Sequence, residues 1–155
     1  MTPKQVVCQE TLKIRKINKD AVIPEYATHG SVGLDLRSVG EYNIKAGQQV
    51  LIKTGFAVEI PYGYVGLVCS RSGLALKEGL MVLNSPGIID PDYRGDNDEV
   101  GVILYNTGSV HKEYQVKAGD RIAQLVLISA PQFGIQEVET LGNNDRGGFG
   151  STGKG

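Results

Sequence analysis

The chain has 155 residues, 41% of them hydrophobic, which is enough for one domain with a buried core. Its formal net charge of −1 argues against a protein that binds nucleic acid or a membrane surface, because both partners require a basic face. Two cysteines without the spacing of a disulfide framework, and no apolar segment of signal-peptide or membrane-spanning length, predict a cytoplasmic protein.

Short runs rich in β-branched residues, separated by turns, predict an all-β protein. Their spacing is typical of a sandwich, a barrel or a jelly roll. Residues 44–47 read IKAG and residues 116–119 read VKAG, and in both turns we expect the glycine in a left-handed conformation. The expected strands, in chain order, are residues 12–17, 49–54, 56–60, 64–69, 80–84, 100–106, 121–129 and 134–140.

One short helix is expected, from Ser72 to about Lys77, directly after Arg71. Ser72 suits the N-cap position, and the free N–H groups of the first turn would lie beside the Arg71 guanidinium. Because Gly73 allows a close approach, this segment can hold a phosphate oxygen. The alternative interpretation is an ordinary N-cap beside a surface arginine.

Residues 84–95, NSPGIIDPDYRG, are predicted to run from a strand into a tight turn that leaves Asp90 at the strand end, facing a pocket. A carboxylate there is ionised at neutral pH and can accept a proton from water as a weak base. A nearby dication would have to orient or acidify that water. The alternative is that Asp90 and Asp92 only form the turn on either side of Pro91.

Residues 145–153, DRGGFGSTG, contain four glycines and cannot build a core. Backbone amides together with Arg146, Ser151 and Thr152 suit a polyphosphate, and Phe149 offers a flat face on which a base can stack. These features indicate a nucleotide as the ligand. A flexible glycine-serine tail is the alternative interpretation.

Five segments occur in order along the chain: residues 30–36 (GSVGLDL), 71–73 (RSG), 87–95 (GIIDPDYRG), 119–125 (GDRIAQL) and 145–153 (DRGGFGSTG). Together they give the chain a resemblance to the homotrimeric dUTPase family, the deoxyuridine triphosphate pyrophosphatases. The resemblance implies an all-β, distorted jelly-roll or β-sandwich fold of the β-clip type, with a domain over residues 1–140 and a glycine-rich arm over residues 141–155.

The resemblance implies that water attacks the α-phosphorus of dUTP and releases dUMP and pyrophosphate. Such an activity limits uracil incorporation into DNA and supplies dUMP for dTMP synthesis. Asp90 would orient and deprotonate the water, and Tyr93 would pack on the deoxyribose and exclude a 2′-hydroxyl. Asn84 and the backbone around Gly87 and Ile88 would read uracil.

The same resemblance implies that the other segments bind the three phosphates. The tail would close over the γ-phosphate and place Phe149 over uracil, in a homotrimer whose subunits share three sites. Mg²⁺ would be carried by the triphosphate and water without a direct protein ligand. Asp35 would lie in the second coordination shell or act as a structural hydrogen-bond acceptor. The residues assigned to the α- and β-phosphates are Arg71, Ser72, Gly73 and Gln124, and those assigned to the tail are Arg146, Phe149, Gly150, Ser151 and Thr152.

Two departures from the family pattern stand out. Residues 96–99 intervene before the strand that follows the third segment, and Arg146 lies closer to Phe149 than the pattern places it. Three rival interpretations remain. A dCTP deaminase would need a glutamate where Ile103 stands. A non-catalytic nucleotide sensor would keep the pocket, and a structural jelly-roll subunit would leave the tail unexplained.

Overall fold

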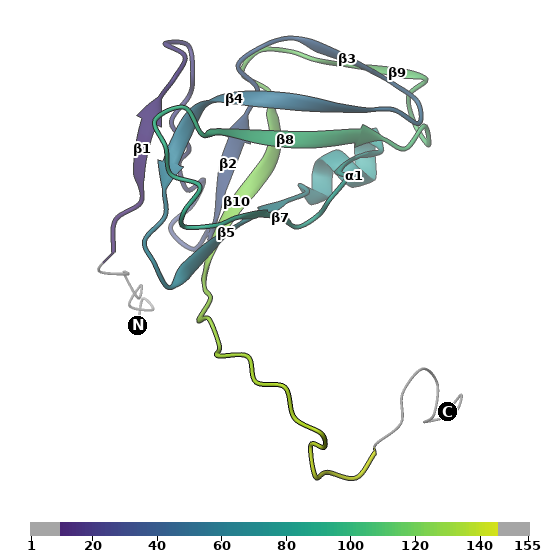
Figure 1. Cartoon of the computed structure of the whole chain (residues 1–155). Coiled ribbons are helices and arrows are strands. Elements are labelled where there is room, and N and C mark those ends of the chain that lie inside the picture. Colours follow the sequence, from purple (N-terminus) through teal and green to yellow (C-terminus); the bar gives the residue numbers. More distant parts are fainter. Residues whose placement is uncertain (1–9, 146–155) are drawn as a thin grey trace, which may run out of the picture.

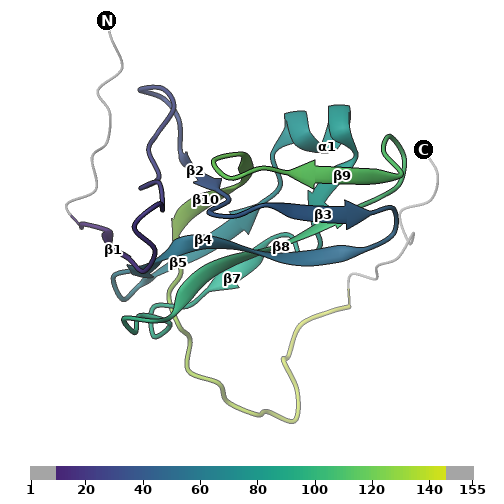
Figure 2. The same ribbon diagram turned by 90° about the horizontal axis from the view of Figure 1, so that it is seen from above.

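The computed structural model describes residues 10–145, which form two four-stranded antiparallel sheets and a two-stranded ribbon (Figure 1 and Figure 2). This jelly-roll-like sandwich with one short helix confirms the predicted fold class. The first sheet has the order β1 (Lys13–Lys16), β4 (Gln49–Glu59), β8 (Glu99–Asn106) and β6 (Leu80–Val82). The second sheet has the order β2 (Gly33–Arg37), β10 (Arg121–Ser129), β5 (Tyr64–Cys69) and β7 (Gly87–Ile89), and β3 (Tyr42–Lys45) pairs with β9 (Glu113–Val116).

The core lies between the two sheets and follows from strict alternation along the strands. Strand β8 alternates partly exposed and buried residues over its whole length, so Val100, Val102 and Leu104 all point inward. Phe56 from β4 and Leu125 from β10 meet them in one cluster and are fully buried. Each such aliphatic or aromatic side chain contributes about 1.5–3 kcal/mol by leaving water. This core fixes the positions of the strand ends that carry the polar segments.

Strand β4 replaces two of the predicted strands, residues 49–54 and 56–60, with a single strand that contains an irregularity. The pairing with β8 shifts register between Lys53 and Ala57, and Gly55 adopts φ +78°. Glycine is required there, because a Cβ would lie 2.9 Å from the Cβ of Ala21. The predicted break between two strands at Gly55 is therefore a bulge within one strand and not a turn.

Helix α1 (Ser72–Glu78) confirms the predicted helix but not its predicted cap. Arg71 is the N-cap residue, Ser72 is the first helical residue, and no side chain caps the first turn. The prediction of Ser72 as N-cap is therefore wrong by one position. The helix ends at Gly79, whose left-handed φ of 67° suits a C-cap glycine.

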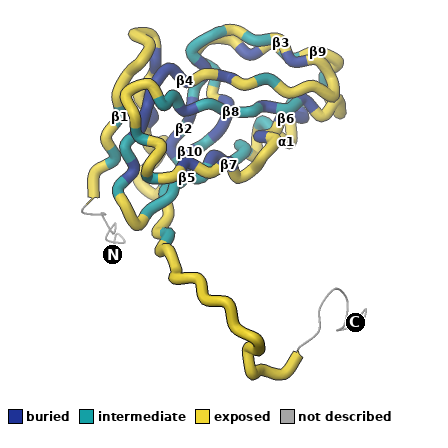
Figure 3. Tube along the Cα trace, viewed as in Figure 1, coloured by how far each residue is buried: buried dark blue, intermediate teal, exposed yellow. Residues whose placement is uncertain are grey.

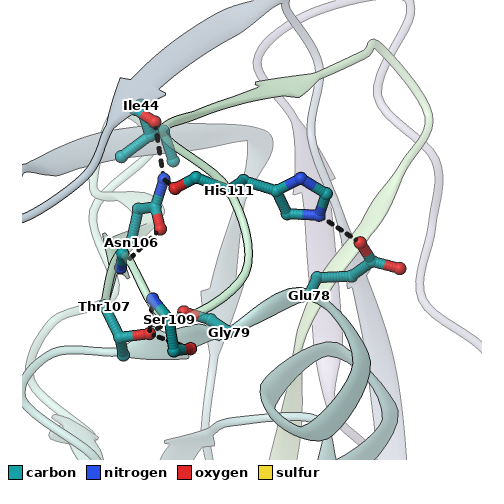
Figure 4. A network of polar contacts seen from close by, with 8 residues as sticks. Ile44, Glu78, Gly79, Asn106, Thr107, Ser109 and His111 are labelled. Atoms are coloured by element: carbon teal, nitrogen blue, oxygen red, sulfur yellow. Dashed lines mark hydrogen bonds and ion pairs between the residues drawn. The ribbon is translucent and has the colours of Figure 1, made fainter.

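Polar contacts hold the C-terminal end of α1 (Figure 4). They matter for its position since none of the helix residues is fully buried. His111 Nε2 lies 2.7 Å from Glu78 Oε2, and the Thr107 hydroxyl donates to the Gly79 carbonyl oxygen over 2.8 Å. The buried Asn106 donates to the His111 carbonyl oxygen over 3.2 Å and so fixes the loop that carries the imidazole. The first turn is held separately, because Leu74 packs against the core and Arg71 pairs with Asp35.

The remaining predictions of local structure divide clearly. Gly47 and Gly119 adopt φ of 75° and 89°, which confirms both left-handed turns. The short strands β2, β3 and β9 were missed, whereas β7 confirms the strand that was predicted directly before Asp90. The predicted strand over residues 134–140 is wrong, because no strand pairs with this segment in the described part of the chain. Residues 131–145 instead leave the sheets as an exposed, extended segment (Figure 3). From here on we call residues 131–145 the arm, as distinct from the predicted glycine-rich arm over residues 141–155. No helix among residues 10–145 has the length and apolar character needed to cross a membrane.

Candidate active site

A cavity of about 280 Å³ lies between the edge strand β7 and strands β4 and β8 of the other sheet, and it gathers four of the predicted site residues: Asn84, Gly87, Ile88 and Tyr93. Strand β7 supplies Gly87 and Ile88, and the turn after it supplies Tyr93. Leu51 of β4 and Ile103 of β8, which are register partners, form an apolar wall. An apolar wall facing a strand edge suits a planar heterocycle, which can use both apolar contact and backbone hydrogen bonds.

Strand β7 is the edge strand of its sheet, because it pairs with β5 on one side only. Its register with β5 joins Val68 to Gly87 and Leu67 to Ile88. The other edge of β7 therefore presents N–H and C=O groups that the sheet leaves unpaired. Gly87 is buried and carries no side chain, so a ligand can approach this backbone closely.

Asp90 directly follows β7, as predicted, but its exposed side chain does not line this cavity. Its carbonyl oxygen accepts a hydrogen bond of 3.1 Å from the Tyr93 N–H, which closes a turn between the two residues. Arg94 holds this turn in place: it donates to the carbonyl oxygens of Pro91 and Ile60 and lies 4.5 Å from the ring centroid of Tyr62. The carboxylate of Asp90 thus projects from a braced turn beside residues that line the cavity.

A second polar cluster joins Arg71, Asp35 and Arg121. Arg71 Nε lies 3.1 Å from Asp35 Oδ1, and an Arg121 guanidinium nitrogen lies 3.2 Å from Asp35 Oδ2. Asp35 and Arg71 are mostly shielded from water, so the pairing is stronger than that of an exposed ion pair. One carboxylate therefore orients two guanidinium groups, which is an arrangement suited to binding a polyanion.

Gln124 joins this cluster from the middle of β10. Its Nε2 donates to the Ser70 carbonyl oxygen over 3.0 Å, next to Arg71. Gly33 of β2 makes room for it, since a Cβ at Gly33 would lie 2.5 Å from Gln124 Oε1. The structure thus brings the predicted phosphate residues Arg71 and Gln124 together with Asp35.

Arg71 and Gly73 also line a second cavity, of about 350 Å³, between α1, β9 and the start of β10. Tyr114 lies in its wall, and burial raises the pKa of the Tyr114 hydroxyl, with the negative charges of Glu78 and Asp120 adding to the effect. The hydroxyl therefore stays protonated at neutral pH. Among residues 10–145, no cluster of three or more His, Cys, Asp or Glu side chains could hold a metal ion.

The two clusters lie at opposite ends of strand β5. Ile89 is the register partner of Gly66, so Asp90 comes level with Val65, and Arg71 follows the other end of the strand at Cys69. At about 3.3 Å per residue, Asp90 and Arg71 are separated by roughly 20 Å along the sheet. The predicted site residues are therefore not brought together in one chain. Arg146, Phe149, Gly150, Ser151 and Thr152 lie outside the described residues.

Comparison with known proteins identifies the family. The dUTPase family model matches residues 19–153. The chain belongs to the dUTPase family. A deoxyuridine 5′-triphosphate nucleotidohydrolase from Nautilia profundicola is 48% identical, over 92% of this chain and 99% of its own. The homologous enzyme of Hydrogenobaculum sp. is 47% identical, over 92% of this chain and 97% of its own.

Solved dUTPase structures share the fold. The Staphylococcus bacteriophage 80alpha dUTPase with dUpNHpp has a TM-score of 0.82 and 29% identity, over 92% of this chain and 98% of its own. The dUTPase from phage phi11 of S. aureus, described with a structural Mg(II) ion, has a TM-score of 0.76 and 28% identity, over 85% of this chain and 99% of its own.

Sequence motifs did not predict several contacts in this site. Arg121 lies inside the fourth segment but was given no role, and the pairing with Asp35 crosses 86 positions of sequence. Arg94 and Glu99 were also missed, although the run of acidic residues after Gly95 marked an unusual return to β8. Ile103, which stands where a dCTP deaminase would need a glutamate, lines the cavity beside β7.

Replacing Asp35 by asparagine is expected to lower kcat/KM for dUTP about tenfold, because Arg71 and Arg121 lose the charge that orients them. Steady-state kinetics on the purified variant check this. Asp20→Asn, at an exposed aspartate in the loop after β1, is the matched control and should keep the original kcat/KM. A value for Asp35→Asn within twofold of the unchanged protein would contradict the role given to the cluster.

Proposed function

We propose that this protein hydrolyses dUTP to dUMP and pyrophosphate. The observation that carries the proposal is the cavity at the edge of β7, where four residues of the predicted nucleoside site meet beside Asp90 in a chain of the dUTPase family. Its relatives are named deoxyuridine 5′-triphosphate nucleotidohydrolases.

Uracil would be read by the free edge of β7. An N–H and a C=O around Gly87 and Ile88 can pair with O4 and N3–H of uracil, and Asn84 can add a side-chain contact. Cytosine reverses the donor and the acceptor at these two positions, so buried groups would stay unpaired. Such a mismatch supports discrimination of roughly 10⁴-fold. A C5-methyl group, as in thymine, would meet the wall of the cavity.

Tyr93 would pack against the deoxyribose. Its ring lines the cavity directly after the turn that begins at Asp90. A ring in this position leaves no room for a 2′-hydroxyl, so ribonucleotides are excluded. The same turn therefore supports both the sugar contact and the catalytic carboxylate.

Asp90 would act as the general base. It accepts one proton from a water molecule as the water oxygen attacks the α-phosphorus, and the bond from the α-phosphorus to the bridging oxygen breaks to release pyrophosphate. Mg²⁺ bound to the triphosphate would offset the negative charge that the attacking water meets. The ion would be held mostly by phosphate oxygens and water, because Mg²⁺ usually keeps several waters. Asp35, engaged by two arginines, would support the phosphate contacts from behind.

The phosphates would bind Arg71, Ser72, Gly73 and Gln124 of another subunit. Because roughly 20 Å separate Asp90 and Arg71 along β5, one α-phosphate cannot touch both clusters of a single chain. The arm adds a second argument, since Phe133, Ile135 and Leu141 are 84%, 100% and 83% exposed. Apolar residues presented in this way are typical of a segment that packs on a neighbour. A homotrimer with shared sites accounts for both observations.

The tail would complete the site. Arg146, Ser151 and Thr152 would contact the γ-phosphate, with Phe149 and Gly150 over the base. We also propose a cytoplasmic protein that binds neither nucleic acid nor a membrane, since its net charge is −1. The division between a domain over residues 1–140 and an arm over residues 141–155 stays a prediction.

Incubation with dUTP, dCTP and UTP in the presence of Mg²⁺, followed by chromatography of the products, tests the proposal. We expect dUMP and pyrophosphate from dUTP alone. Deamination of dCTP would favour the deaminase interpretation. Binding of dUTP without any product would favour a sensor.

A further inference from the structure

Glu99, the first residue of β8, has a carboxylate that is anchored away from solvent. Its side chain lines the nucleoside cavity and is only 17% exposed. Oε1 accepts a hydrogen bond of 2.9 Å from the Gly55 N–H, and Oε2 lies 3.2 Å from Lys53 Nζ. The side chain therefore joins the start of β8 to the bulge of β4.

The backbone of Glu99 makes the second half of the connection. Its carbonyl oxygen accepts a hydrogen bond of 3.0 Å from the Tyr93 hydroxyl. Apart from the turn at its own backbone, this is the polar contact that holds Tyr93 within residues 10–145. Glu99 thus connects the aromatic ring that would face the sugar to the interior of the first sheet.

The anchor point on β4 is itself fixed. The Gly55 carbonyl oxygen accepts hydrogen bonds of 2.8 and 2.9 Å from the N–H groups of Ile17 and Asn18. Ala21 and Val39 lie so close that a Cβ at Gly55 would clash with them. A carboxylate bonded to this N–H therefore has a rigid partner on the opposite strand.

The residues between Tyr93 and Glu99 form a loop that closes on itself. Asp98 Oδ2 accepts a hydrogen bond of 2.7 Å from the Gly95 N–H, and the Asp98 N–H donates to the Gly95 carbonyl oxygen over 3.0 Å. Arg15 of β1 donates to the Asp96 carbonyl oxygen over 2.6 Å. The inserted residues are thus held apart from the cavity, and Glu99 is where the chain returns to it.

We propose that Glu99 is a positioning residue that sets the selectivity for deoxyribose by fixing its own carbonyl oxygen, and through it the Tyr93 hydroxyl. The proposal rests on the proposed function and names a residue that the base and phosphate contacts do not involve. A ring held at its hydroxyl end cannot move aside for a 2′-oxygen. A ring released from that bond can, because Tyr93 is 43% exposed and lines a cavity.

The test compares kcat/KM for dUTP and for UTP in the full-length protein. Glu99→Ala removes the anchor, Glu99→Gln keeps an acceptor for the Gly55 N–H, and Tyr93→Phe removes only the hydroxyl. Glu113→Ala, at an exposed glutamate of β9 outside both cavities, is the control. Thermal unfolding of each variant verifies that it is folded.

We expect Glu99→Ala and Tyr93→Phe each to raise kcat/KM for UTP relative to dUTP about five- to tenfold, which is the effect of one hydrogen bond. Glu99→Gln should stay within threefold of the unchanged protein, because it preserves the anchor. The double variant Glu99→Ala/Tyr93→Phe should match the single variants, because both changes break the same connection.

Two results would overturn the proposal: a UTP-to-dUTP ratio that is unchanged in Glu99→Ala and Tyr93→Phe, including the case where kcat/KM falls equally for both nucleotides, or a double variant whose effect equals the product of the two single effects. Tyr93→Phe changes only a partly exposed hydroxyl, so its result stands even where Glu99→Ala does not fold. If the unchanged protein does not hydrolyse dUTP, the proposed function fails instead. The two failures are therefore distinct.

Discussion

Replacing Asp90 by asparagine is expected to lower kcat for dUTP by about 10²- to 10⁴-fold while leaving nucleotide affinity near its original value. Asparagine has nearly the same shape but cannot take a proton from water. Within residues 10–145, the Asp90 carboxylate has neither a hydrogen bond nor an ion pair, so its loss should not disturb the fold. Single-turnover kinetics and equilibrium binding of a non-hydrolysable dUTP analogue measure the two quantities separately.

Asp92→Asn is the matched control, because Asp92 is an exposed aspartate on the other side of Pro91 in the same turn. It should leave kcat within a few fold of the unchanged protein. Full activity in Asp90→Asn would mean that another group activates the water. A large rise in Kd with little loss of kcat would mean that Asp90 only helps to bind the nucleotide.

Removal of residues 143–155 is expected to abolish dUTP hydrolysis without unfolding the sheets. The removed segment carries Arg146, Ser151 and Thr152, whose donors suit the γ-phosphate, and its last described residues are exposed. Core strands end at Ser129 in β10, so the buried cluster keeps all of its members. Hydrolysis assays and far-ultraviolet circular dichroism check the two parts of this prediction.

A shorter truncation that removes only Lys154 and Gly155 is the control, since it preserves the glycine-rich motif. It should hydrolyse dUTP at close to the original rate. Loss of the folded signal in the longer truncation would show that the tail supports the fold. Unchanged hydrolysis in that variant would show that the tail takes no part in the reaction.

Alternation over long strands made most of the first sheet predictable. Strand β8 shows a buried residue at every second position, and the sequence expectation of residues 100–106 differs from it by one residue. Strand β7 was expected directly before Asp90, but its bounds could not be assigned, because a run of three residues carries no measurable period. Buried and partly exposed residues alternate along β2, with Leu34 and Leu36 buried. The segment was nevertheless interpreted as part of a motif and not as a strand.

The arm shows a limit of a different kind. Residues 134–140 have the composition of a strand, but a strand also needs a partner with a free edge. Among residues 10–145 of one chain the segment has none. The composition of this segment is therefore compatible with a strand. Whether a strand forms depends on a partner strand with a free edge beside the arm.

The site was predictable where motifs supply the residues and unpredictable where contacts join distant strands. Asn84, Gly87, Ile88 and Tyr93 come from one stretch of chain and do line one cavity. The clamp of Asp35 on Arg121 depends on the pairing of β2 with β10, and the anchor of Glu99 depends on the bulge in β4. No spacing within a single sequence reveals such contacts.

In the proposed trimer, Asp90 of one subunit would act on a nucleotide whose phosphates are bound by Arg71 of another. Asp90→Asn and Arg71→Ala should each be inactive alone. When the two variants are co-expressed in equal amounts, random trimers should place an intact Asp90 opposite an intact Arg71 in about one quarter of the sites. We predict recovery of about a quarter of the original dUTP hydrolysis in the mixed trimers. No recovery at all would contradict a site in which Asp90 and Arg71 come from different subunits.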